Sequence, residues 1–323
     1  KDNYFREAIL HVESGEAMGT FLQVRSENEI PCDVSLHIRK IFGDIEAVCS
    51  RFLKESEISR INENSGICSV KVSQTCMKII KKSMQVAEFT NGVFDPSIGA
   101  MSSLWNIGSE SEYVPTEKEI QKAWSLVDYR NILIDGNSVF LENKGMSLDL
   151  GGIAKEYAIH QAANFCRKKK LEGIIIDCGG DISTVGKKPD GSDWRIGIQH
   201  PRRRNNLIAS VVLASWNTVE TSGDYRRFIK NDDLFQSHIF SVNNEKRVPL
   251  SSATLVYDGN YDFPLTSSAL LAGGLDFSKR MLKKCKGMEA ILITDKFEVF
   301  VTKNLYDYCN VISDHSEKIL LDL

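Results

Sequence analysis

Short apolar runs joined by tight turns constrain the fold of this chain more than any other feature. Residues 132–134 and 139–141 flank Asp135-Gly136, a dipeptide that favours a two-residue hairpin. Residues 290–293 and 298–301 predict a second hairpin near the end of the chain. Strands joined by hairpins run antiparallel. Because helical stretches lie between them, the pattern predicts an α+β fold with a largely antiparallel sheet and packed helices, without the βαβ alternation of a Rossmann fold.

Four helices are predicted from apolar spacing and end signals. Residues 34–52, including Leu36 and Phe52, repeat apolar side chains at near-helical intervals and predict a helix that faces the core. A helix over about 73–89 ends at Asn91-Gly92, and a capping box at 116–119 starts another. A longer helix is predicted over about 265–284.

Composition sets the scale of the protein and removes two classes of partner. The 323 residues are 42% hydrophobic, which suffices for a large core, and no repeat or linker divides them. We therefore predict a single domain, residues 1–323, made of two closely joined halves. The net charge of -3 gives no basic footprint for nucleic acid, and no apolar run of about 18 residues predicts a membrane span.

The eight cysteines are spread along the chain without a CxxC pair or zinc-binding spacing. Most of them are expected to pack as small apolar side chains. A disulfide between Cys68 and Cys76 is an alternative. A fully reduced set would suit a low-oxygen habitat or the cytoplasm.

The segment SLDLGGIAKEYA, residues 147–158, combines a strand end, two glycines and a helix that carries a lysine. Backbone N–H groups at Gly151-Gly152 could converge on an anion, assisted by the positive end of the helix and by Lys155. A plain turn between strand and helix explains the same residues. Asp149, entering the turn, fits a helix cap as well as a binding role.

Three further sites hold polar side chains that would suit a ligand. Asp95 lies in an Asp-Pro-Ser turn, Thr221 and Asp224 flank a Ser-Gly turn, and His238 lies in a short apolar run. Each also has a structural explanation, as a turn residue or as a hydrogen-bonded histidine of the core. No P-loop, HExxH or Ser/His/Asp signature is present.

Taken in order, several stretches resemble the FAD:protein FMN transferase family, also called the ApbE family. The resemblance runs over roughly residues 17–300. It is carried by Met18-Gly19-Thr20, Ser56-Glu57-Ile58-Ser59-Arg60-Ile61-Asn62, residues 91–99 (NGVFDPSIG), Leu104-Trp105, residues 148–155 (LDLGGIAK), Gly179-Gly180-Asp181-Ile182, residues 194–199 (WRIGIQ) and Thr221-Ser222-Gly223-Asp224-Tyr225.

The resemblance implies a module of the T-fold kind with FAD in a cleft between its halves. Members transfer FMN from FAD to a threonine of a partner protein and release AMP, with a hard cation, usually Mg²⁺, at the pyrophosphate. Many members are exported lipoproteins. The expected location is therefore the cell envelope, on the outer face of the cytoplasmic membrane, with the cytoplasm as the alternative.

Residue by residue, the resemblance also implies roles in the site. His238 would be a general base or an orienting group near the phosphates. The carbonyl of Gly152 and the side chain of Ser268 would bind the metal. The residues that would contact FAD are Met18, Phe52, Asp95, Asp149, Lys155, Thr221 and Asp224, with Phe52 standing where a tyrosine is usual.

The sequence departs from the family pattern around the expected metal. The aspartate position is occupied by Pro264, a residue suited to the start of a helix but unable to bind a cation through its side chain. Asp262 could substitute only if the backbone took another route. Glu156 and His160 replace the usual glycine and aspartate. A second reading is therefore a non-catalytic flavin-binding or partner-binding relative that has lost the metal site.

Overall fold

A nine-stranded sheet organises the structure, a computed structural model that describes residues 11–230, 235–241, 248–313 and 316–323. Its strands lie in the order β1 (His11–Ala17), β2 (Thr20–Ser26), β6 (Ile174–Cys178), β7 (Asp181–Val185), β10 (Thr218–Gly223), β13 (Leu250–Tyr257), β14 (Glu289–Thr294), β15 (Val299–Thr302) and β17 (Lys318–Leu321). Neighbours are antiparallel except β15 and β17. The predicted α+β class and the largely antiparallel sheet are confirmed.

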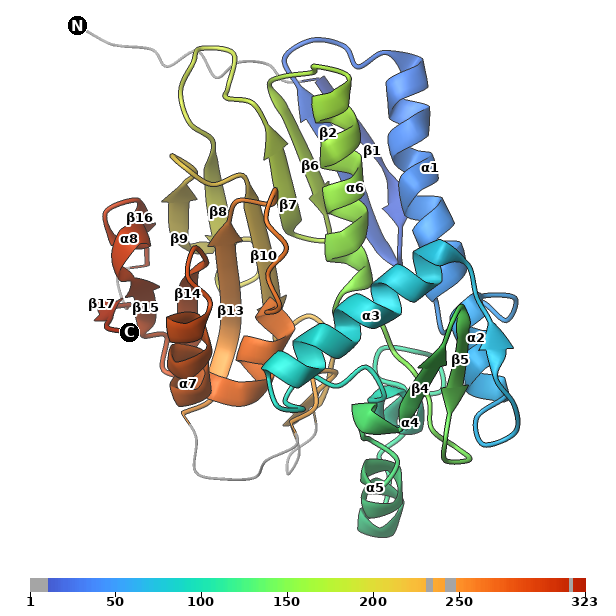
Figure 1. Cartoon of the computed structure of the whole chain (residues 1–323). Helices are drawn as coiled ribbons and strands as arrows, with labels where there is room; N and C mark the ends of the chain where they lie inside the picture. The colour runs from blue at the N-terminus through green and yellow to red at the C-terminus, as the bar shows by residue number, and fades with distance from the viewer. Residues whose placement is uncertain (1–10, 231–234, 242–247, 314–315) are drawn as a thin grey trace, which may run out of the picture.

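Helices cover one face of this sheet (Figure 1). In the figure α1 (Cys32–Cys49) and α6 (Ala154–Lys168) lie side by side near the strands β1, β2 and β6, and α7 (Ser267–Lys284) packs against β13 and β14. The helix α3 (Gln74–Phe89) joins the same core. Strands and helices from distant parts of the sequence therefore share one large apolar core.

The opposite face packs against a smaller sheet of β16 (Cys309–Val311), β9 (Leu207–Val212) and β8 (Arg195–Gln199). Strand β6 illustrates how both faces are covered. Ile174 and Ile176 join the helical core, whereas Ile175 joins the second core on the other side. Because alternate side chains point to opposite faces, an uninterrupted apolar run is what a strand buried on both faces requires.

The remaining elements lie beside the main sheet. The predicted hairpin is β4 (Ile132–Asp135) and β5 (Ser138–Leu141), which pair with β3 (Val70–Lys71). The predicted capping box of Thr116 and Glu119 is present at the start of α5. The other elements are α2 (Glu57–Glu63), α4 (Gly99–Trp105), α5 (Glu117–Trp124), a 3-10 turn (Tyr129–Asn131), β11 (Phe228–Lys230), β12 (Phe235–Ser237) and α8 (Lys303–Tyr306).

Two predicted helices differ from the observed ones. The first ends at Cys49, so Phe52 lies beyond it and is 65% exposed, and Leu36 is also exposed rather than in the core. The long helix α7 begins after the N-cap residue Thr266, so Pro264 precedes the helix instead of starting it. Gly274, with a φ of 76°, interrupts α7. Its left-handed backbone is readily adopted only by glycine.

All eight cysteines are free, which contradicts the alternative of a Cys68–Cys76 disulfide. Cys76 is buried and Cys68 is exposed. Most of the other cysteines pack in the core as expected. Among the described residues, no helix combines the length and apolar character needed to cross a membrane.

Candidate functional site

A cavity of about 1460 Å³ opens between the start of β2, the end of α1, the turn before α6, the end of β10 and the β11–β12 hairpin. Typical pockets for small ligands measure about 300–1,000 Å³. The cavity is therefore larger than a typical pocket for one small ligand.

Nearly all the side chains singled out from the sequence meet in this cavity. Residues that line it include Met18, Phe52, Asp95, Asp149, Gly152, Lys155, Thr221, His238 and Ser268. Asp224 is outside the lining. These residues lie as many as 250 positions apart in the sequence, so only the tertiary fold brings them together.

Two ion pairs flank the Gly-Gly turn, Asp149 with Arg51 and Asp181 with Lys155. Asp149 accepts a hydrogen bond from the N–H of Gly151 at 2.8 Å, and its other oxygen lies 3.1 Å from Nε of Arg51. Lys155, in the first turn of α6, forms an ion pair with buried Asp181. Burial opposes the charge on Lys155, but the Asp181 carboxylate outweighs this effect and raises the pKa of Lys155.

Asp95 has mainly a structural role in the loop that forms one wall. Its carboxylate accepts hydrogen bonds from the N–H and the hydroxyl of Ser97, at 2.8 and 2.6 Å, and from the N–H of Tyr129 at 2.9 Å. Burial raises the pKa of Asp95 in spite of these bonds. The turn interpretation of the sequence thus accounts for the contacts of this residue.

Phe52 and Met18 provide apolar surface at the rim. The guanidinium carbon of Arg51 lies 4.1 Å from the ring centroid of Phe52, a cation–π contact. Met18 takes a left-handed backbone with a φ of 54°, and its N–H donates to Glu46 at 2.9 Å. Both residues face the cavity, where a flat aromatic ligand could stack.

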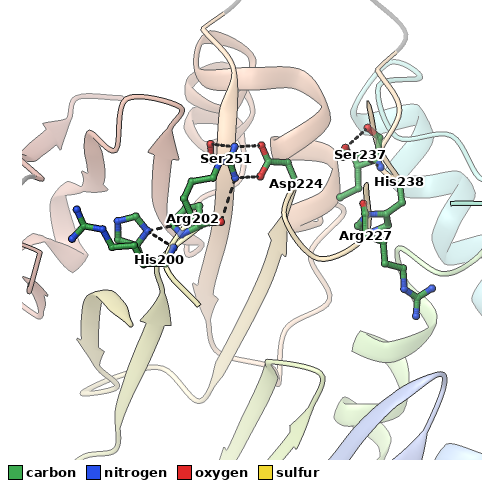
Figure 2. A network of polar contacts seen from close by, with 10 residues as sticks. His200, Arg202, Asp224, Arg227, Ser237, His238 and Ser251 are labelled. Carbon is green, nitrogen blue, oxygen red and sulfur yellow. Dashed lines mark hydrogen bonds and ion pairs between the residues drawn. The ribbon is translucent and has the colours of Figure 1, made fainter. Parts of the chain in front are cut away.

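Asp224 does not line the cavity itself but binds Arg202, which does and which was not predicted from the sequence. Arg202 donates two hydrogen bonds to the Asp224 carboxylate, at 2.6 and 2.7 Å, and a third to Ser251 at 3.1 Å. Figure 2 shows Arg202 held between His200 and these two residues. Arg202 lines the cavity although Asp224 does not. Thr221 also has a structural bond, because its N–H donates to Asp181 at 3.0 Å.

His238 lies just after β12 and is half-buried beside Arg227, the residue that precedes β11 (Figure 2). Its Nδ1 lies 3.0 Å from the carbonyl oxygen of Arg227. Since a carbonyl can only accept, Nδ1 carries a proton. Burial lowers the pKa of His238, which favours the neutral ring. The neutral tautomer leaves Nε2 with a free lone pair that can accept a proton.

Positive charge dominates the cavity lining. The basic residues are Arg51, Lys155, Arg202, Arg204, Arg226, Arg227 and Lys230, and the acidic ones are Glu46, Asp95 and Asp149. None of these arginines was predicted to belong to the site. The runs at 202–204 and 226–227 were visible next to the landmark motifs and could have indicated them. An excess of cations in a cavity favours an anionic ligand.

Pro264 occupies the position where the resemblance implies a metal-binding aspartate. A side chain at Gly152 would come within 3.1 Å of Oγ of Ser268, so these two predicted ligands do adjoin. Pro264 does not line the cavity, and Asp262 pairs instead with Lys82 and leaves 78% of its side chain exposed. Nowhere in the described ranges do three or more His, Cys, Asp or Glu side chains form a ready cluster for a metal ion.

Fold and cavity together define an α+β protein with a large, basic site. The model of the ApbE family matches residues 18–292, which is most of the chain. The protein belongs to the ApbE family. This confirms the resemblance that the sequence motifs carry.

Named relatives match over most of their length. An FAD:protein FMN transferase of Klebsiella pneumoniae is 26% identical over 285 residues, covering 81% of this chain and 87% of the relative. An FAD:protein FMN transferase of Treponema pallidum is 25% identical, and the match covers 91% of this chain and 87% of that relative. The ApbE crystal structure from Thermotoga maritima superposes with a TM-score of 0.81 at 26% identity, covering 93% of this chain and 99% of that one. The family fold is therefore retained by a divergent chain.

Proposed function

We propose that this protein is an FAD:protein FMN transferase, which moves FMN from FAD to a threonine hydroxyl of a partner protein and releases AMP. The observation that carries the proposal is the large basic cavity in which His238 and the Gly-Gly turn before α6 meet. Membership of the ApbE family and relatives that bear this name support it.

The reaction breaks the pyrophosphate of FAD. The threonine oxygen attacks the phosphorus of the FMN half, and the bond from that phosphorus to the bridging oxygen breaks. AMP leaves with the bridging oxygen, and the threonine proton passes to a base. His238 suits this role because Nδ1 is fixed on the Arg227 carbonyl and Nε2 can accept the proton.

The other lining groups bind and orient the dinucleotide. The N-terminus of α6 and the cations Arg226 and Arg227 would stabilise the phosphate oxygens. Lys155 would contact the same oxygens while Asp181 holds its ammonium in place. Phe52, carried at the rim, offers a face on which the flavin ring can stack.

A divalent cation, expected to be Mg²⁺, belongs to the proposal, but the residues at the family position do not fit it. Hard dications prefer several oxygen ligands that include carboxylates. Here the hydroxyl of Ser268, which shares a hydrogen bond of 3.0 Å with Thr266, adjoins Gly152 without any carboxylate. Pro264 supplies no ligand, and Asp262 is engaged by Lys82. Ser268 and a carbonyl alone do not make a site for such an ion.

The same observation favours a second candidate function. A protein that kept the flavin cavity and lost the metal carboxylate could bind FAD, or a partner protein, without transferring FMN. Pro264 is the residue that favours this alternative, whereas His238 and its fixed tautomer favour the enzyme.

The acceptor and the location are also proposals. The partner is a protein with a target threonine, which must reach into the cavity beside the FMN phosphate. We propose that the reaction takes place in the cell envelope, on the outer face of the cytoplasmic membrane. Fractionation of cells followed by immunodetection would test the location, and a purely cytoplasmic signal would contradict it.

Mass spectrometry tests the activity directly. Purified protein is mixed with FAD, Mg²⁺ and an acceptor domain that bears the target threonine, and the acceptor is examined for an added FMN. The control acceptor carries valine in place of that threonine. An adduct on the threonine form alone supports transfer. FAD binding without an adduct would leave the non-catalytic alternative, and absence of both would contradict the two functions together.

A further inference from the structure

The β11–β12 hairpin stands beside the large cavity with one face packed and the other open. Ile229 of β11 is buried in an apolar cluster with Trp105 and Phe240. Because successive side chains of a strand alternate, Phe228 and Lys230 point to the opposite face. Both are exposed and line the large cavity. The hairpin is therefore anchored on one side and presents its other side, which we call the outer face, to the cavity.

Two aromatic rings lie together on the outer face. Phe235 pairs with Lys230 in the register of the hairpin, so its side chain shares the face of Lys230 and Phe228. Phe228 is 42% exposed and Phe235 is 47% exposed, and their ring centroids lie 5.4 Å apart. Neighbouring aromatic rings that stay exposed at the edge of a cavity are typical of a surface that contacts a partner or a ligand.

The outer face leads directly to the proposed general base. His238 follows β12, and its N–H donates to the carbonyl oxygen of Arg227, just before β11, at 3.1 Å (Figure 2). The pair of Lys230 and Phe235 lies three residues farther along the same two strands, which corresponds to about 10 Å at the usual rise per residue. An extended chain whose threonine lies at His238 would therefore reach this pair with a residue about three positions away.

Two cations beside the aromatic rings are not neutralised by the protein. Lys230 and Arg204 line the cavity, and neither pairs with a carboxylate of the described residues. Arg202 differs, because Asp224 binds its guanidinium at 2.6 Å. Free cations next to apolar rings complement a partner segment that combines acidic and apolar side chains.

We propose that the outer face is the docking surface for the segment of the acceptor protein that flanks the target threonine. The segment is extended, places an apolar side chain on Phe228 and Phe235, and places an acidic side chain about three residues from the threonine beside Lys230. The inference rests on the proposed function, since an acceptor must bring its threonine to His238. Charge complementarity and continuity with His238 favour this occupant.

A pair of short peptides tests the docking surface. The acidic probe has a central threonine, leucine on both sides of it, and aspartate three residues before and three residues after it. The matched probe carries lysine in place of both aspartates. Binding of the fluorescein-labelled probes to the whole protein with FAD is measured by fluorescence anisotropy at low salt. We expect the acidic probe to bind at least about fivefold more tightly than the matched probe.

Variants of the outer face should change this binding. Phe228→Ala and Phe235→Ala should each weaken binding of the acidic probe by at least about fivefold, because each removes an exposed ring from the contact. Lys230→Glu should reverse the preference and favour the lysine probe. The matched controls are Tyr261→Ala and Lys296→Glu, which change exposed side chains outside the cavity and should bind the acidic probe like the parent protein.

Equal binding of the two probes, or no loss in either alanine variant, would overturn the proposal. Circular dichroism verifies that each variant is folded, and two independent alanine variants keep the test valid if one fails to fold. FAD affinity, measured by quenching of flavin fluorescence, should stay at the parent value. If FAD affinity falls while peptide binding does not, the outer face binds the dinucleotide and the proposal is wrong.

Mass spectrometry of the acidic probe and of an acceptor domain keeps the failure of this surface distinct from that of the proposed function. Transfer of FMN at the parent rate in both alanine variants would support the proposed function and contradict the docking surface. If the probes bind as predicted but FMN reaches neither the probe nor the acceptor domain, the proposed function is wrong, and the surface for an acidic segment remains.

Discussion

The large cavity and a second, much smaller cavity, which we call the rear chamber, share the Gly-Gly turn as a wall and differ in charge and size. The large cavity holds about 1460 Å³ and is rich in arginine, whereas the rear chamber holds about 30 Å³ and is lined by the acids Glu156, Asp181 and Glu220 beside Lys155. The comparison teaches that one turn of the chain borders two spaces of opposite charge. Several landmark motifs line the large cavity, whereas Pro264, at the position where the resemblance implies a metal-binding aspartate, supplies no carboxylate.

The first prediction concerns the chemistry of the large cavity and has the largest expected effect. Replacing His238 with alanine removes the proton acceptor, so the rate of FMN transfer should fall by roughly 10²–10⁴-fold. FAD affinity should change little, since the ring contacts the Arg227 carbonyl rather than forming a phosphate cradle. Time-resolved mass spectrometry of the acceptor measures the rate.

His37 offers the matched control. It is an exposed histidine on α1 that stacks on Phe165, away from the cavity. His37→Ala should transfer FMN at the parent rate. An unchanged rate in His238→Ala would show that His238 is not the general base. The cavity would then act only by positioning the reactants.

The second prediction tests the ion pair in the wall between the two regions. Lys155→Met leaves Asp181 buried without its cation, which should cost about 3 kcal/mol of unfolding free energy. The measurement is urea denaturation at neutral pH. The double variant Lys155→Met with Asp181→Asn should recover part of the loss, because no unpaired charge is then buried. No recovery would show that the two side chains do not act as a pair.

The fold could be predicted further than the site. Hairpins and apolar periodicity are local signals, so the 132–141 hairpin, the Thr116 capping box and the antiparallel sheet followed from the sequence. The end of α1 did not, because Phe52 continues the apolar spacing although the helix has stopped. Apolar spacing shows which side chains could face the core. It does not show where the surface that the helix packs against ends.

The site was predictable only where motifs carried it. The resemblance brought together residues as distant as Met18 and Ser268, which no local pattern connects. It did not indicate that Asp224 serves Arg202, or that Glu156 and Glu220 would face each other from α6 and β10. Such pairs depend on strand register and helix placement, which the sequence does not state.

The third prediction tests how tightly the wall is packed. A side chain at Gly152 would come within 3.0 Å of the Phe94 ring and 3.1 Å of Ser268, so Gly152→Ala should lower the unfolding free energy by about 1–3 kcal/mol. Its control is Gly43→Ala on α1, where nothing lies within 4 Å; helix propensity alone should stabilise that variant by up to about 1 kcal/mol. If both variants change the unfolding free energy equally in urea denaturation, the residues around Gly152 can move to accommodate the added methyl group.

The smallest effect is expected at position 264, where the resemblance implies a metal-binding aspartate. Pro264→Asp introduces a carboxylate there, but residue 264 precedes α7 and lines neither cavity. The affinity for Mn²⁺, used as a substitute for Mg²⁺ and followed by electron paramagnetic resonance of the free ion, should therefore stay at the parent value. A marked gain in affinity would show that a carboxylate at position 264 can reach a cation beside the cavities.

A crystal structure of the protein grown with FAD tests the assignment of the large cavity most directly. We expect flavin density in the large cavity, with the pyrophosphate beside Lys155 at the N-terminus of α6 and the outer face of the β11–β12 hairpin free of ligand. A pyrophosphate away from Lys155, or an adenine ring stacked on Phe228 and Phe235, would contradict this assignment.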